Sequence, residues 1–180
     1  MCIRDSNTSA FAPGATVYRF DDLTSPFDGG SVKTGSFDSE YAAPFGDTTP
    51  YLSVGPSTSS PATLALSGVN QISFYWGSID SFNTITFDGL GTSFTGSTFD
   101  GTDAHSSREV TFNFSDAEAA ALTGISLSST QNAFELDNLV VGNAVPEPAT
   151  YGIMGLGLGL IGAVLRRRRS ATTAPSFRFA

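Results

Sequence analysis

The sequence predicts an all-β protein in which about nine short strands form a β-sandwich or a barrel. Short runs rich in Val, Ile, Phe, Tyr and Thr recur between residues 16 and 142, and turn-forming Gly, Asp, Asn and Ser separate them. Several runs alternate apolar and polar residues, as strands with one buried face do. Charged residues make up only 14% of the chain, a composition that favours strands and turns over helices.

Nine runs have the period and length of strands, and they cover residues 16–20, 31–37, 51–54, 62–66, 71–76, 83–87, 109–114, 124–129 and 133–141. In the run 71–76, Phe74 and Trp76 share one face, so Trp76 is expected in the core and Tyr75 on the opposite side. Asp-Gly pairs at 88–89 and 100–101 predict hairpin turns.

One short helix is expected near residues 116–122. Ser115 and Glu118 have the spacing of a capping box, in which each side chain accepts a hydrogen bond from the backbone of the other. Alanines follow, and Gly124 ends the pattern. This helix would connect two strands.

The charge pattern and the rare residue types exclude several function classes. Residues 1–145 hold 16 acidic and four basic residues, so the body has too few cations to bind nucleic acid. With one cysteine, Cys2, the chain has no intramolecular disulfide and no zinc site with several thiolates. The one histidine, His105, has no nucleophile motif beside it, so we expect a solvated loop residue and a protein that is not an enzyme.

Calcium is the candidate cofactor, because Asp, Asn and backbone carbonyl oxygens are abundant at the turns. Asp22 follows the first predicted strand, and Asp137 interrupts the last one. The apolar residues of the last strand change parity between Leu136 and Leu139, which predicts a bulge near Asp137. If the first and last strands pair, the two carboxylates would approach one calcium ion; otherwise they face solvent or cap turns.

Residues 149–165 form an uncharged run that is expected to be a transmembrane helix. Seventeen residues span about 25 Å as a helix, the lower limit for crossing a bilayer. A soluble amphipathic helix is disfavoured because the run has no polar face. Arg166, Arg167, Arg168 and Arg169 follow and would stay in the cytoplasm, so the acidic body is expected outside it.

Val145, Pro146, Glu147 and Pro148 precede this run, and the two prolines impose an extended conformation. The order of VPEP, Gly-rich span and arginines at 144–169 resembles the PEP-CTERM sorting signal of exopolysaccharide-producing Gram-negative bacteria. The resemblance implies recognition by an exosortase in the inner membrane and removal of the hydrophobic tail. The body would then reach the cell surface or the extracellular matrix. Residues 170–180 depart from such signals and are expected to be a disordered tail.

The N-terminal residues 1–13 contain no apolar run of signal-peptide length, although an exported protein needs one. We expect this segment to be truncated or disordered, with MCIRDS not native. The β-sandwich domain is expected to cover residues 14–143.

Three segments of the body resemble exosortase-dependent surface proteins, namely YLSVG (51–55), YWGSIDSFNTITF (75–87) and NAFELDNLVV (132–141). FELDNLVV is also similar to the last strand of jelly-roll carbohydrate-binding modules, which implies a jelly-roll-like sandwich. The expected function is non-enzymatic binding of exopolysaccharide, with Tyr75 as an exposed platform for a sugar ring. The alternatives are a structural surface or spacer protein without a ligand and a glycan-cleaving enzyme.

Overall fold

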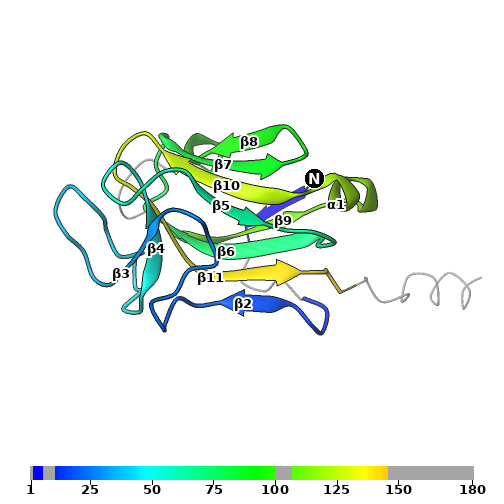
Figure 1. Cartoon of the computed structure of the whole chain (residues 1–180), viewed down its shortest axis with the longest axis horizontal. Helices are drawn as coiled ribbons and strands as arrows, with labels where there is room; N and C mark the ends of the chain where they lie inside the picture. Colours follow the sequence, from blue (N-terminus) through cyan, green and yellow to red (C-terminus); the bar gives the residue numbers. More distant parts are fainter. Residues whose placement is uncertain (1, 6–10, 100–106, 146–180) are drawn as a thin grey trace, which may run out of the picture. The chain divides into compact units, whose positions relative to one another are not determined.

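The computed structural model describes residues 2–5, 11–99 and 107–145. These residues form a sandwich of two antiparallel sheets, one of seven strands and one of four, with little helix (Figure 1). The predicted all-β sandwich is therefore confirmed, whereas its jelly-roll connectivity stays a prediction.

The larger sheet is built around β11, which lies between β6 and β4 and also pairs with β2. Its spatial order is β1 (Cys2–Asp5), β9 (Arg108–Asn113), β6 (Gln71–Gly77), β11 (Phe134–Gly142), β4 (Tyr51–Val54) and β3 (Ser31–Lys33), with β2 (Thr16–Tyr18) beside β11. The smaller sheet has the order β5 (Ala62–Ala65), β10 (Gly124–Ser129), β7 (Asn83–Asp88) and β8 (Thr92–Thr95). A 3-10 helix, η1 (Gly96–Phe99), follows β8.

All nine predicted strands are present, and the structure adds β1 and β8. β8 escapes the sequence pattern because Phe94 is its one apolar residue. The predicted turn at Asp88–Gly89 does connect β7 to β8, and the predicted turn at 100–101 lies outside the described residues. β1 lies within the segment 1–13 and pairs along its whole length with β9. The local sequence does not predict such a long-range contact.

The hydrophobic core fills the space between the inner faces of the two sheets. Trp76 of β6 is fully buried and stacks on Phe134 of β11, with ring centroids 4.5 Å apart. Phe87 of the smaller sheet meets Phe112 of the larger one edge to face, with centroids 4.9 Å apart. Aromatic pairs in these geometries add to the stabilisation from burial. The prediction that Trp76 belongs to the core is confirmed.

The short helix α1 (Asp116–Ala121) connects β9 to β10 and has the predicted cap. The Ser115 hydroxyl accepts a hydrogen bond from the Glu118 N–H at 3.4 Å. The Glu118 carboxylate accepts one from the Ser115 N–H at 2.9 Å. These two bonds satisfy backbone donors that the first helical turn leaves open, so the capping box is confirmed.

The predicted bulge interrupts β11. The register of β11 against β6 shifts between Asp137 and Val140, and Asn138 has a positive φ of 52°. Leu136 before the bulge and Leu139 after it are both fully buried in the core. The bulge therefore keeps both halves of the strand facing inward, as the change of parity in the sequence requires.

Within the described part of the chain, no helix is both long and apolar enough to cross a membrane. The span expected at 149–165 lies outside this part, as does His105.

The β7–β8 turn allows a test of the contact between the smaller sheet and α1. A Cβ at Gly89 would lie 2.1 Å from the Ala121 carbonyl oxygen, whereas a Cβ at Gly91 would meet no atom within 4 Å. Both glycines have positive φ, so Gly91→Ala should cost about 1–2 kcal/mol from backbone strain alone. Gly89→Ala should cost about 1–3 kcal/mol more, because the backbone must also move. Urea unfolding of both variants measures the difference, and equal losses would contradict the contact.

Candidate functional site

The loop of residues 34–50, which connects β3 to β4, folds over the outer face of the larger sheet. Phe37 pairs with Tyr41 through a backbone bridge, and their rings stack with centroids 6.1 Å apart. Farther along, the Ala42 N–H donates to the Glu135 carboxylate of β11 at 3.0 Å, and Pro44 packs against Gly77 of β6. Figure 1 shows this 34–50 loop reaching outward at one end of the sandwich.

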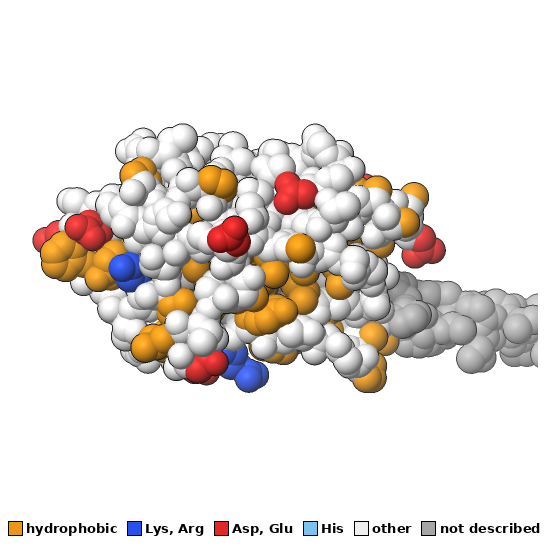
Figure 2. All heavy atoms as spheres, in the orientation of Figure 1, with side chains coloured by type: hydrophobic (Ala, Val, Ile, Leu, Met, Phe, Trp, Pro, Cys, Tyr) orange, Lys and Arg blue, Asp and Glu red, His pale blue; other side chains and the backbone are white. Residues whose placement is uncertain are grey.

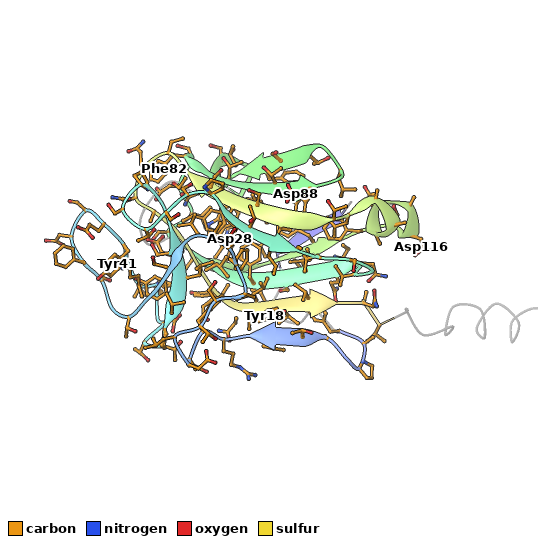
Figure 3. The ribbon with its side chains drawn as sticks, viewed as in Figure 1. Tyr18, Asp28, Tyr41, Phe82, Asp88 and Asp116 are labelled. Atoms are coloured by element: carbon orange, nitrogen blue, oxygen red, sulfur yellow. The ribbon has the colours of Figure 1, made fainter. Side chains whose placement is uncertain are left out.

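An acidic hollow of about 200 Å³ lies between the 34–50 loop and the sheet. Among the described residues, those that line it include four acidic side chains, two aromatic rings and neither Lys nor Arg. The carboxylates come from the loop, from the segment after β6 and from β11; they are Asp38, Glu40, Asp80 and Glu135. The rings are those of Phe37 and Tyr41, and Figure 3 labels Tyr41 on the outward-reaching loop.

Glu135 is the buried carboxyl group of the acidic hollow. It lies in β11 opposite Gly77 and Ser53, with its side chain on the outer face, and only 1% of it is exposed. One carboxyl oxygen, Oε1, accepts the Ala42 N–H, whereas Oε2 is buried without a hydrogen-bond partner in the described structure. Burial raises the pKa of Glu135 to about 8, against the opposing effect of the Ala42 hydrogen bond, and the charge of Asp80 adds to the increase. The carboxyl group is therefore largely protonated at neutral pH.

A second pair of carboxylates meets at the β11 bulge. Asp137 is 1% exposed, and Thr49 Oγ1 lies 3.3 Å from its Oδ2 and 2.5 Å from Oδ1 of Asp47. Asn138 donates a further hydrogen bond to Asp137 Oδ2 at 2.9 Å. Burial raises the pKa of Asp137 to about 6, and the negative charge of Asp47 acts in the same direction. Asp137 Oδ1 and Asp47 Oδ2 are buried without hydrogen-bond partners in the described structure.

The structure places the two predicted calcium ligands in different surroundings. The pairing of β2 with β11 that the prediction required is present. The exposed Asp22 carboxylate, however, accepts hydrogen bonds from the backbone and hydroxyl of Thr24, which lower its pKa, while Asp137 contacts Asp47 and Thr49. No group of three or more His, Cys, Asp or Glu side chains is arranged to hold a metal ion in residues 2–5, 11–99 and 107–145.

Two carboxylates whose buried oxygens have no hydrogen-bond partner in the described part of the chain nevertheless fit the preference of calcium for oxygen ligands. Asp47 and Asp137 are those residues, and the Thr49 hydroxyl lies beside both. Asp47 could have been singled out from the sequence, because Asp47-x-Thr49 repeats the pattern Asp22-x-Thr24. In each case the aspartate accepts a hydrogen bond from the backbone N–H of the threonine two residues later.

Tyr75 lies on the outer face, opposite in register to Asp137, and is partly buried. Its hydroxyl donates to the Phe45 carbonyl at 2.7 Å, so the 34–50 loop covers part of the ring. The strongly exposed aromatic side chains of this loop are Phe37 and Phe45, at 57% and 66%. Sequence reasoning missed them because nothing local distinguishes an exposed loop phenylalanine from a core one.

Of the predicted sorting residues, Val145 ends the described structure and is 44% exposed. Pro146, Glu147, Pro148 and the four arginines at 166–169 lie outside it.

The raised pKa of Glu135 predicts how stability depends on pH. The native state keeps this proton up to about pH 8, whereas the unfolded chain releases it near the ordinary Glu value of about 4.3. Stability should be greatest below the ordinary value and fall as the pH rises to about 8, by up to about 1.4 kcal/mol per pH unit.

Glu135→Gln should remove most of the loss of stability between pH 6 and 8. It should keep the loss of stability at lower pH, which the raised pKa of Asp137 produces. Urea unfolding at a series of pH values measures both slopes. Glu40→Gln, which removes an exposed acid of the 34–50 loop, is the control and should leave both slopes unchanged. A Glu135→Gln variant with the wild-type slope above pH 6 would refute the assignment.

Residues 144–169 match the PEP-CTERM protein-sorting motif. No curated protein matches the chain in sequence. Among solved structures, a similar chain comes from work titled "The complexity of the Ruminococcus flavefaciens cellulosome reflects an expansion in glycan recognition". The two are 15% identical, with a TM-score of 0.39 over 76% of this chain and 98% of the other. The protein is thus a β-sandwich followed by a PEP-CTERM sorting motif, the motif of proteins that are exported and processed by exosortase.

Proposed function

We propose that the protein is a non-enzymatic surface protein whose sandwich binds exopolysaccharide at the acidic hollow. The observation that carries this proposal is the combination of aromatic rings and carboxylates at one hollow on an outward-reaching loop. Aromatic rings stack on the apolar faces of sugars, and carboxylates accept hydrogen bonds from their hydroxyl groups. Phe37 supplies an exposed ring there, in place of the partly covered Tyr75.

Sorting would place the sandwich where it can meet such a glycan. We propose that residues 149–165 span the inner membrane of a Gram-negative cell in the precursor, with the body outside the cytoplasm. Exosortase then removes the hydrophobic tail, and the body stays on the cell surface or in the extracellular matrix.

We further propose that Asp47 and Asp137 hold a calcium ion. Its charge would neutralise two carboxylates that otherwise lie together, each with one buried oxygen that has no hydrogen-bond partner among the described residues. The ion would tie the 34–50 loop to the bulge of β11. It would thereby hold the loop that forms one wall of the acidic hollow.

A structural spacer without a ligand is the second candidate, and the outer face of the smaller sheet favours it. Hydroxyl residues align across all four strands of this sheet, in the order Thr63, Ser126, Thr86 and Ser93. Thr86 and Ser93 hydrogen-bond to each other at 2.9 Å. An uncharged face without aromatic rings at these positions suits hydration better than ligand binding.

Hydrolysis is an alternative because Glu135, with its raised pKa, and Asp80 line the same hollow. We favour binding because only 1% of Glu135 is exposed and the Ala42 N–H holds one of its oxygens. A general acid must contact the glycosidic oxygen that it protonates. Release of reducing ends from the host glycan, lost in Glu135→Gln, would overturn the binding proposal.

The sorting proposal predicts the mass of the mature protein. Intact mass spectrometry of the protein from its host should show a product that lacks residues 153–169. In a Glu147→Ala variant the motif is broken, so the full mass should accumulate. A mature wild-type form that retains the apolar run and the arginines would contradict processing.

The calcium and glycan proposals are tested together by retention on the host exopolysaccharide in calcium and in EDTA. Wild-type protein should bind in calcium, and EDTA should release it. At calcium one hundred times above its Kd, the wild-type protein should gain about 2.7 kcal/mol of stability, and Asp137→Asn should gain none. Asp22→Asn is the matched control, because its carboxylate contacts Thr24 in its own turn.

A loss of the calcium effect in Asp22→Asn would instead support the pair that the sequence predicted. Retention in neither buffer would favour the structural spacer.

A further inference from the structure

Two segments that are distant in the sequence hold the last residues of the sandwich by hydrogen bonds. Between β5 and β6, the Asn70 N–H donates to the Gly142 carbonyl at 3.1 Å, and the Asn70 side-chain oxygen Oδ1 accepts the Ala144 N–H at 2.7 Å. From the other side, the Ala12 N–H donates to the Asn143 carbonyl at 2.7 Å. The backbone of each of residues 142–144 is thus bonded to the fold, and we call these three residues together with Ala12 and Asn70 the C-terminal clasp.

Packing supports the side of the C-terminal clasp that residues 11–15 form. Phe11 makes an antiparallel bridge with Ala144. A Cβ at Gly142 would lie 2.7 Å from the Cβ of Ala15, so this segment lies against the end of β11 with no room for a side chain between them. Residues 142–144 are therefore fixed both by hydrogen bonds and by close contact.

The sorting motif becomes accessible where the C-terminal clasp ends. Val145 is 44% exposed, and Pro146-Glu147-Pro148 follow it directly. A protease binds its substrate as an extended chain, so a peptide bond among residues that are hydrogen-bonded within the fold is cut only from an opened form. Bonds within 142–144 thus require the clasp to open, whereas the prolines after Val145 favour an extended chain without any opening.

We propose that the C-terminal clasp sets the upstream limit of processing, so that the mature protein ends within residues 145–148. This inference rests on the proposed processing by exosortase and names the stretch in which the body is separated from the tail. Hydrolysis of one peptide bond there consumes one water molecule and leaves a carboxylate on the body and an amine on the tail. On the other side the stretch is limited by the apolar run from residue 149, which is expected to lie in the bilayer in the precursor.

The intact mass of the mature wild-type protein from its host identifies its last residue. We expect an end within 145–148. An end at or before Ala144, or beyond Pro148, would overturn the inference and leave export and processing intact. A wild-type protein that keeps the whole tail would overturn both proposals.

Two matched variants test the C-terminal clasp without exosortase. Asn70→Ala removes the acceptor of the Ala144 N–H and keeps the backbone bond from Asn70 to Gly142. Asn113→Ala is the control, because it removes one side-chain hydrogen bond, from Gln71 at 2.8 Å, at the same end of the sheet and leaves the clasp in place.

Digestion of the full chains with proteinase K under native conditions, followed by mass spectrometry, measures where each is cut. Wild-type protein and Asn113→Ala should give a body that ends at Val145 or later. Asn70→Ala should be cut within 142–144 on the order of two to ten times faster, because one hydrogen bond fewer opposes opening. Equal rates of cutting there in the two variants would overturn the inference.

A second variant opens the C-terminal clasp from its other side. Gly142→Ala places a Cβ against Ala15, so residues 11–15 must move away and cutting within 142–144 should again be faster than in the control. Urea unfolding of the same samples shows whether each variant is folded. A folded Gly142→Ala variant that is cut as slowly as the wild-type protein would overturn the inference even if Asn70→Ala does not fold.

Discussion

The bulge between Asp137 and Val140 is the constraint on which the arrangement of β11 depends, and β11 holds the larger sheet together. Without an extra residue, the second half of the strand would turn its leucine and valine to the outer face. With it, Leu136 and Leu139 both enter the core and three strands, β2, β4 and β6, find partners along the same strand. The same bulge sets Asp137 on the outer face, beneath the 34–50 loop.

The outer face of the larger sheet is unusual because its polar residues are buried. Glu135 and Asp137, two residues apart in β11, are both 1% exposed and both have raised pKa values because of burial. Buried carboxyl groups destabilise a fold unless partners offset the cost of their desolvation. The loop supplies some partners through Ala42 and Thr49, but one oxygen of each carboxyl group has none in the described structure. Protonation offsets this cost at Glu135, and the calcium ion proposed at the bulge would offset it at Asp137.

The face of the molecule drawn in Figure 2 carries both acidic and basic side chains, and the acidic ones are more widely spread. At the end where the 34–50 loop lies, hydrophobic, acidic and basic side chains lie together (Figure 2). Such a surface repels anionic polymers and tolerates hydration. Such a surface is compatible with the sorting motif at 144–169, which is the motif of exported proteins.

The C-terminal motif and the sandwich are predicted from different kinds of sequence pattern. The motif is a local order of prolines, apolar residues and arginines, so it can be read without any fold. The sandwich is encoded in periodicity, and its nine predicted strands and capped helix are all found, because alternation and capping act over a few residues. β1 and β8 were not predicted, since each is stabilised by a partner strand more than by its own pattern.

Sequence alone also determined the bulge at Asp137, because the parity of the apolar residues cannot otherwise be satisfied within one strand. It could not decide which carboxylate meets Asp137. Asp22 and Asp47 have the same local pattern with a threonine two residues later, and only the path of the 34–50 loop brings Asp47 to the bulge. The acidic hollow likewise exists only in the tertiary structure, because its walls come from segments almost 100 residues apart whose contacts depend on the packing of the whole sheet.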